Sequence, residues 1–252
     1  MRLKKLKISL ISAGSVLLAA ILAFFVWAQF FYYRPSTDAL SALVTNDKVA
    51  VKQEGGIEFI PLEGSGKTGF IFYPGGKVDE KAYSYIGSML AFKGFPVFIV
   101  KMPLRLAVFN PNAASKIIES NQQIENWVIG GHSLGGSMAA LFAYNNSTDI
   151  DGIIFLASYP SGSNNFSNYD VEILSIAGTS DGIINSKNLE DAKLLLPKSA
   201  EFIEIQGANH SQFGDYGFQS GDNSSQIDKN IQHELVIKNI LNFLEEIEKN
   251  NF

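Results

Sequence analysis

The stretch WVIGGHSLGGSMAALFAYN, residues 127–145, decides the fold. It joins an apolar run, Trp127–Gly131, to a longer run of small and apolar residues, Leu134–Asn145. A short apolar run is typical of a buried strand, and the second run is long enough for a helix. We therefore predict a strand, a tight turn and a helix, with Ser133 in the turn.

The flanking sequence repeats this alternation. Strands are predicted at Lys48–Gln53, Ile57–Pro61, Gly69–Tyr73, Pro96–Val100, Ile153–Ala157, Ile173–Ala177 and Phe202–Gln206. Helices are predicted at Glu80–Phe92, Asn112–Ser120, Ser186–Leu195 and Asp228–Ile247. The first two strands flank a Glu-Gly-Gly turn, which indicates a hairpin. Apolar strands that alternate with helices indicate an α/β fold with a mainly parallel sheet and helices on both faces.

The N-terminus predicts one transmembrane helix ahead of this fold. Ile8–Phe31 carries no charge and exceeds the 20 or so residues that cross a bilayer. We favour an uncleaved signal-anchor, and a cleaved signal peptide is the alternative. Four basic residues precede the span, namely Arg2, Lys4, Lys5 and Lys7. This excess of positive charge places the N-terminus in the cytoplasm. We therefore expect a single-pass protein of the cell membrane whose folded domain lies on the extracytoplasmic side. The expected division is 1–33 anchor, 34–47 linker and 48–252 domain.

Composition excludes several kinds of site. The 252 residues have a net charge of −5, and beyond residue 33 there are 16 basic and 25 acidic side chains. This balance argues against a nucleic-acid partner. The chain has no cysteine, which rules out disulfides and thiolate sites. A metal site of several histidines would need nearly all of the three present, which are His132, His210 and His233.

Ser133 stands in the pattern G-x-S-x-G, between Gly131 and Gly135. A serine at a sharp strand-to-helix turn presents its hydroxyl to a substrate, and the glycines allow close backbone packing. The first N–H groups of the helix lie beside it, where they can stabilise an oxyanion. We predict that Ser133 is a nucleophile. The alternative is a glycine-rich turn without chemistry.

His210 is the histidine that the pattern favours as the base for Ser133. It follows the predicted strand Phe202–Gln206, and catalytic groups collect at the carboxyl ends of strands in open α/β sheets. The side chain of His132 is expected to point away from that of Ser133, and His233 falls in a helix. The alternative is that His210 is a structural histidine.

A carboxylate must hold the base in the correct tautomer. Asp181 follows the strand Ile173–Ala177 directly and is favoured for this role. Asp151 and Asp170 precede strands, so they belong to the opposite edge, and Asp215 lies on a Gly/Ser-rich loop. The alternative for Asp181 is a residue that only closes an Asx-turn.

The chain resembles the α/β-hydrolase superfamily, in its small lid-less branch related to dienelactone hydrolases, as a membrane-anchored bacterial type. The resemblance covers about residues 48–247. It rests on four motifs, which are YPGGK (73–77), GGHSLGG (130–136), GTSDG (178–182) and GANHSQFGDYG (207–217). It implies the α/β-hydrolase fold and a triad of Ser133, Asp181 and His210, in the chain order of the family.

The resemblance also implies an oxyanion hole of backbone N–H groups. In the family one donor follows the nucleophile, here Leu134, and the other lies on the loop after the third strand. Many members have His-Gly-x on that loop, whereas this chain has Pro74. Alignment then gives Gly76 as the donor, with Lys77 as the alternative. Residues 158–170, where a lid is often inserted, are too few for a helical cap, which implies an open site and a small or accessible substrate.

Two further patterns are weaker. Gly64–Thr68 reads GSGKT, but a phosphate-binding loop needs a glycine where Pro61 stands and must open a helix, whereas this segment opens a strand. Lys101 and Arg105 follow a strand at the same edge as Ser133. They are favoured as solvated or salt-bridged side chains, and contact with an anionic substrate is the alternative.

These features predict a membrane-anchored serine hydrolase, an esterase-like carboxylic ester hydrolase that acts on small-molecule acyl substrates. Acyl transfer or amide hydrolysis by the same triad stays open. A catalytically silent domain that binds at the cell surface is a third possibility, and the complete triad argues against it. We expect no cofactor and no metal.

Overall fold

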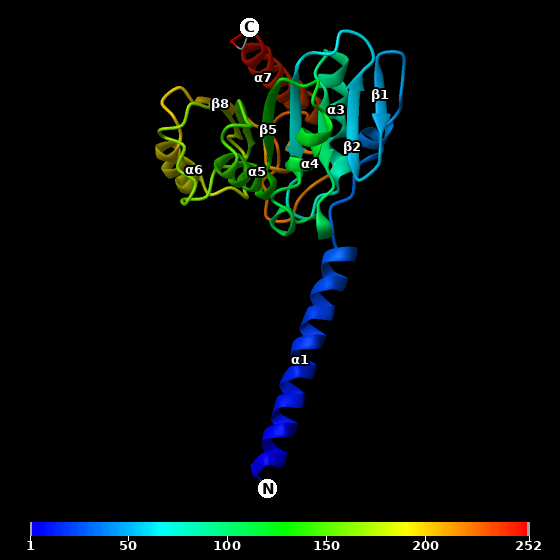
Figure 1. Cartoon of the computed structure of the whole chain (residues 1–252), viewed down its shortest axis with the longest axis vertical. Coiled ribbons are helices and arrows are strands. Elements are labelled where there is room, and N and C mark those ends of the chain that lie inside the picture. Colours follow the sequence, from blue (N-terminus) through cyan, green and yellow to red (C-terminus); the bar gives the residue numbers. More distant parts are fainter. Residues whose placement is uncertain (1, 251–252) are drawn as a thin grey trace. The chain divides into compact units, whose positions relative to one another are not determined.

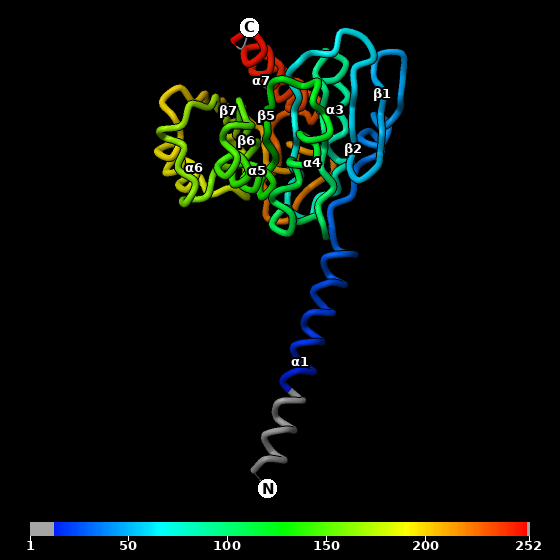
Figure 2. Tube along the Cα trace, in the orientation of Figure 1, coloured from blue at the N-terminus to red at the C-terminus, as the bar shows by residue number. Residues whose placement is uncertain are grey.

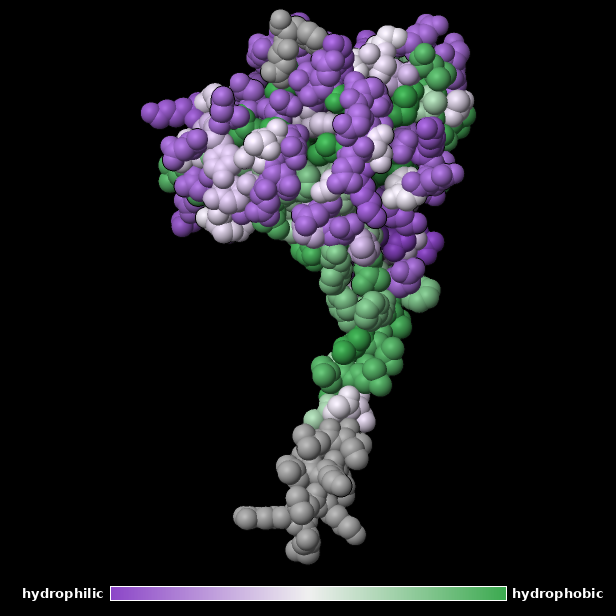
Figure 3. Space-filling view, viewed as in Figure 1, coloured by the Kyte–Doolittle hydropathy of each residue, from purple (hydrophilic) through white to green (hydrophobic). Residues whose placement is uncertain are grey.

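The computed structural model describes the backbone of residues 2–250 and the side chains of residues 13–250. The chain forms two compact units, residues 1–32 and 33–252. In the first, α1 (Arg2–Phe30) has a mean hydropathy of 2.0 over Ala13–Phe30, so it is long and apolar enough to cross a membrane. Figure 3 shows its apolar surface. A signal sequence meets the same criterion of length and composition.

The predicted membrane orientation depends on basic side chains that lie outside the described ones. These are the side chains of Arg2, Lys4, Lys5 and Lys7. The side chains of residues 8–12, which belong to the predicted span, also lie outside the described ones. The orientation therefore stays a prediction.

The second unit is built on one eight-stranded sheet in the order β1-β2-β4-β3-β5-β6-β7-β8 (Figure 1). β2 is antiparallel to both of its neighbours, and all the other pairs are parallel. The mainly parallel sheet of the predicted fold class is confirmed. The strands are β1 (Val49–Lys52), β2 (Gly56–Pro61), β3 (Thr68–Tyr73), β4 (Val97–Val100), β5 (Asn126–His132), β6 (Gly152–Leu156), β7 (Glu172–Gly178) and β8 (Glu201–Ile205).

Helices connect the strands, as the tube in Figure 2 traces. The α-helices of this unit are α2 (Thr37–Ser41), α3 (Ser84–Phe92), α4 (Ala114–Ser120), α5 (Leu134–Asn145), α6 (Ser186–Ala192) and α7 (Lys229–Asn250). Short 3-10 turns are η1 (Glu80–Tyr83), η2 (Pro103–Arg105), η3 (Ala107–Phe109), η4 (Lys193–Leu195) and η5 (Ser211–Phe213). The predicted helix 80–92 thus begins as a 3-10 turn, which Asp79 caps through its side chain.

Both faces of the sheet are covered because successive strand residues point to opposite sides. In β3, Phe70 and Phe72 belong to the core beneath α3 and α7. Ile71 and Tyr73 belong to the core beneath α4 and α5. This explains why β3 is buried at every position and apolar after Thr68.

The segment 34–47, expected as a linker, lies within the second unit. Tyr33 forms a parallel bridge with Val78, and the Ser36 N–H donates to the Asp215 carbonyl at 2.8 Å. The Ser36 side chain also caps α2. Backbone hydrogen bonds therefore attach this segment to the domain.

Candidate active site

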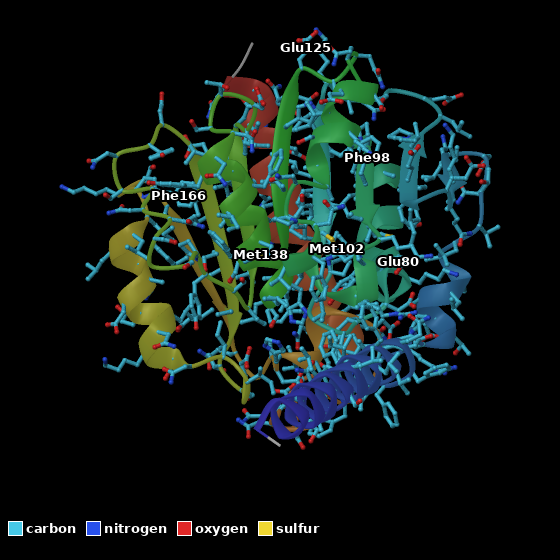
Figure 4. The ribbon with its side chains drawn as sticks, turned by 60° about the horizontal axis from the view of Figure 1, so that its bottom comes forward. Glu80, Phe98, Met102, Glu125, Met138 and Phe166 are labelled. Carbon is cyan, nitrogen blue, oxygen red and sulfur yellow. The ribbon has the colours of Figure 1, made fainter. Side chains whose placement is uncertain are left out.

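The loops after β3, β5, β7 and β8 leave the sheet at one edge, because the carboxyl ends of parallel strands coincide. Figure 4 marks the opposite end of the sheet with Glu125, which lies just before β5. The register pairs Tyr73 with Gly131, which brings the loop after β3 beside the turn after β5. Ser133, Asp181, His210 and Gly76 lie on these loops, and Leu134 is the first residue of the helix that follows β5.

Ser133 occupies the turn between β5 and α5 with φ 52° and ψ −124°. This is a strained conformation for a residue with a side chain, of the kind found at functional sites. A Cβ on either flanking glycine, Gly131 or Gly135, would collide with the Tyr73 carbonyl. Leu134 begins α5, so its N–H has no partner within the helix. The strand, turn and helix predicted from residues 127–145 are present.

In the loop after β3, the amides on both sides of Gly76 are committed to other acceptors. The Gly75 N–H donates to the Tyr83 hydroxyl at 3.0 Å. The Lys77 N–H donates to the Arg105 carbonyl at 2.8 Å. Within residues 2–250, the Gly76 N–H donates to no acceptor.

Gly76 also lies against the start of α5. A Cβ added to Gly76 would stand 3.1 Å from Cδ2 of Leu134. The two amides predicted as oxyanion donors therefore belong to neighbouring backbone segments. With the Lys77 amide already bonded, this geometry favours Gly76 over Lys77.

His210 and Asp181 form a buried pair. Nδ1 of His210 lies 2.8 Å from Oδ2 of Asp181, and both side chains are 1% exposed. The other oxygen of Asp181 accepts hydrogen bonds from the N–H groups of Ile183 and Ile184, each at 2.8 Å. Asp181 thus closes an Asx-turn and contacts His210 at the same time, so the turn leaves the predicted role of Asp181 open.

Ser133 and His210 line one cavity of about 330 Å³. Nε2 of His210 is buried and has no hydrogen-bond partner among the described residues, so the bond to Ser133 is not formed here. Catalytic hydrogen bonds are often long in the absence of substrate. The remaining lining residues are uncharged: Leu134, Ser137, Ala157, Ser158, Tyr159, Ile183, Ile184 and Asn185.

His132 is fully buried beside the pair. Its Nδ1 lies 2.9 Å from the Tyr83 hydroxyl, and its ring centroid lies 4.4 Å from that of His210. Burial, and then the neighbouring His210, hold the pKa of His132 well below its usual range. His132 is therefore a neutral imidazole that packs against the ring of His210.

The other candidates lie elsewhere. Asp215 is 4% exposed and pairs with Lys229 at 3.0 Å, which gives its charge a different partner from His210. Arg105 forms an ion pair with Asp79 at 3.4 Å, as the favoured interpretation of that residue expected. Lys101 lies at a different cavity from Ser133. In the part of the chain that the structure describes, no group of three or more His, Asp or Glu side chains is arranged to hold a metal.

Asp222, which no pattern in the sequence indicated, is a buried carboxylate that contacts two of the site loops. Oδ1 accepts from the N–H groups of Gly182 (3.0 Å), His210 (3.3 Å) and Asn223 (2.8 Å). Oδ2 accepts from the N–H (2.7 Å) and hydroxyl (2.5 Å) of Ser211. Burial raises the pKa of Asp222, but these hydrogen bonds outweigh it and hold the pKa below its usual value. The loop 214–225 is therefore anchored.

Comparison with known proteins agrees with this architecture. A model of the alpha/beta hydrolase family matches residues 69–234. A predicted CIB-like hydrolase from Thermoplasma acidophilum is 12% identical, with a TM-score of 0.57 over 77% of this chain and 99% of that chain. A dienelactone hydrolase from Anabaena variabilis is 15% identical, with a TM-score of 0.55 over 76% of this chain and 97% of that chain. Among curated proteins, none matches the sequence.

Proposed function

The chain belongs to the alpha/beta hydrolase family. We propose that it is a serine hydrolase that acts on esters with a small, uncharged acyl group. Ser133 is the nucleophile, His210 the general base and Asp181 the group that orients His210. The observation that carries the proposal is the buried His210–Asp181 pair, together with the cavity that His210 and Ser133 both line.

The reaction follows from these positions. The Ser133 hydroxyl attacks the ester carbonyl carbon as Nε2 of His210 takes its proton. The Leu134 and Gly76 N–H groups donate to the oxyanion of the tetrahedral intermediate. His210 then returns the proton to the leaving alcohol. Water, activated in the same way, hydrolyses the acyl-serine and regenerates the hydroxyl.

The proposed substrate class comes from the lining of the cavity. A charged acyl group would meet no opposite charge there, because the lining residues other than His210 carry no ionisable group except the Tyr159 phenol. The Ser137 and Ser158 hydroxyls are occupied, since they donate to the carbonyls of Tyr159 and Ser133, both at 2.6 Å. About 330 Å³ is at the small end of ligand cavities. A short, neutral acyl group suits such a site.

We also infer that α1 anchors the enzyme in the membrane, with the hydrolase domain on the outer side. The length and hydropathy of Ala13–Phe30 support an anchor. The basic residues ahead of the span in the sequence support this orientation.

The direct test of the proposed activity is labelling with a fluorophosphonate probe, which reacts with an activated serine. The full chain in detergent should label, and Ser133→Ala should not. Ser137→Ala is a matched control in the same cavity and should still label. A folded wild-type protein that resists the probe and hydrolyses no ester would support a silent binding domain instead.

Substrate class is tested on the same protein with p-nitrophenyl acetate, butyrate and hemisuccinate. Butyrate and acetate should be hydrolysed with higher kcat/KM than the anionic hemisuccinate. A preference for the hemisuccinate would overturn the assignment of an uncharged acyl group while leaving the serine mechanism in place. An amide substrate and an alcohol acceptor in the same assay measure amide hydrolysis and acyl transfer.

A further inference from the structure

One carboxylate joins the two loops that carry the buried histidine and its acid. Asp222, which is 8% exposed, accepts from Gly182 on the loop after β7. It also accepts from the main-chain N–H of His210 and from Ser211 on the loop after β8. A single side chain is thereby bonded to the residue next to Asp181 and to the backbone of His210.

The position of Asp222 matters because the two loops have to be aligned for the 2.8 Å contact between Asp181 and His210. Where the loops begin, the Ser180 N–H donates to the Ala208 carbonyl at 2.8 Å. Asp222 connects the same two loops a second time, further along the chain, beside Asp181 and at His210. Movement of either loop would change the distance between Nδ1 and Oδ2.

We propose that Asp222 is a positioning residue, which acts through the Asp181–His210 pair to fix the orientation of the base; this rests on the proposed function. A carboxylate suits the place because it only accepts hydrogen bonds, and here it faces five donors. Hydrogen bonds to a charged acceptor are stronger than neutral ones. An amide at this position would turn one acceptor into a donor that faces other N–H groups.

A purely structural role is the competing explanation, and the chain provides a matched control for it. Asp215 belongs to the same loop, is also buried and forms its ion pair with Lys229. Asp215→Asn therefore removes a buried charge from this loop without touching the Asp181–His210 pair. Both variants should lower thermal stability, and only Asp222→Asn should change the behaviour of the base.

The first measurement is the pH dependence of ester hydrolysis by the full chain. Asp222→Asn should lower kcat 10- to 100-fold and leave KM within about twofold. The acidic limb of the kcat/KM profile should move to lower pH, because an imidazolium held less well by its carboxylate loses its proton more readily. Ser211→Ala removes one of the five donors and should give a smaller change in the same direction. Asp215→Asn should keep the wild-type profile.

The second measurement is a double-mutant cycle with Asp181→Asn. If Asp222 acts through Asp181, Asp222→Asn should cost less than twofold in kcat once Asp181 is already replaced. The same factor in both backgrounds, or the same profile change in Asp215→Asn, would show that Asp222 only supports the loop and would overturn the proposal.

A third readout does not need catalysis. The Nδ1 proton of His210, shared with Asp181, should give a low-field proton resonance, which Asp222→Asn should move upfield or broaden and Asp215→Asn should not. If the wild-type protein proves inactive, the proposed function fails, yet this resonance still decides the positioning role. An unchanged resonance in folded Asp222→Asn would overturn that role.

Discussion

Nδ1 of His210 lies 2.8 Å from Oδ2 of Asp181 in a contact that is almost fully shielded from water. The contact joins residues that follow β7 and β8, two adjacent parallel strands. In such a place a carboxylate fixes the tautomer of the imidazole and leaves Nε2 to accept a proton. The first prediction tests this relationship.

Asp181→Asn should reduce turnover by about 10⁴, the cost of the wrong histidine tautomer in a serine protease. The fold should survive, because the amide oxygen can still accept from the Ile183 and Ile184 N–H groups. Steady-state kinetics and a melting curve measure both effects. Near-normal turnover would show that Asp181 does not orient the base.

Gly135→Ala should lower the free energy of unfolding by at least about 2 kcal/mol. The new Cβ would collide with the carbonyl oxygens of Tyr73 and Pro74, which are backbone atoms and cannot rotate away. Gly162→Ala is the control, since nothing lies within 4 Å of a Cβ there. Denaturant melts of the two variants should differ clearly, and equal stability would contradict the tight turn described around Ser133.

The turn itself was predictable, because local sequence determines it. The sequence located α5 at Leu134–Asn145, and the strand before it differs from the prediction by one residue at each end. The positions of His210 and Asp181 could also be predicted, since each follows a strand that the sequence indicates. The sheet order, in which β5 pairs with β3, depends on packing between distant strands and has no local signature.

The role of Asp222 was not predicted, because its contacts also lack a local signature in the sequence. Its partners are mainly backbone amides, which every residue possesses, and its loop is rich in glycine and serine. Composition of that kind indicates a loop but not whether it is anchored. Similarly, Tyr83 occupies an apolar position in the helical pattern of the sequence. That pattern does not indicate that its hydroxyl contacts both His132 and Gly75.

The stability of the protein should fall as pH decreases from about 6.5 to 4. Burial lowers the pKa of His233 to about 4, and its ring stacks on Tyr85. An unfolded histidine titrates near 6.5, so in this window the unfolded chain binds more protons. This stabilisation is complete above pH 6.5, and His233 accounts for a loss of about 3 kcal/mol by pH 4.

His233→Phe keeps an aromatic ring against Tyr85 and removes the titration. Chemical denaturation at several pH values should therefore give a shallower slope for the variant between pH 6.5 and 4. His132 also has a lowered pKa and contributes to both proteins, so the comparison isolates His233. Identical slopes in the two proteins would exclude His233 as a source of acid sensitivity.

The intact chain should fractionate with membranes and resist extraction by high salt, because Ala13–Phe30 is apolar enough to span a bilayer. A chain that begins at Tyr33, the first residue of the second compact unit, should be recovered in the soluble fraction. Protease added to intact cells should degrade the hydrolase domain, because the domain lies on the outer side of the membrane. Recovery of an exported protein that begins after about residue 25 would show a cleaved signal sequence.

The most direct test of the account is the double-mutant cycle between Ser133 and His210. Turnover and melting temperature should be measured for Ser133→Ala, His210→Ala and the double variant. Members of a catalytic unit are non-additive, so each single replacement should cost nearly as much as the pair. Stability should hold in Ser133→Ala, because alanine keeps the Cβ and the backbone conformation of the turn and only the hydroxyl is lost. Losses that multiply in the double variant would mean that Ser133 and His210 do not act together, and the assignment of His210 as the base would be withdrawn.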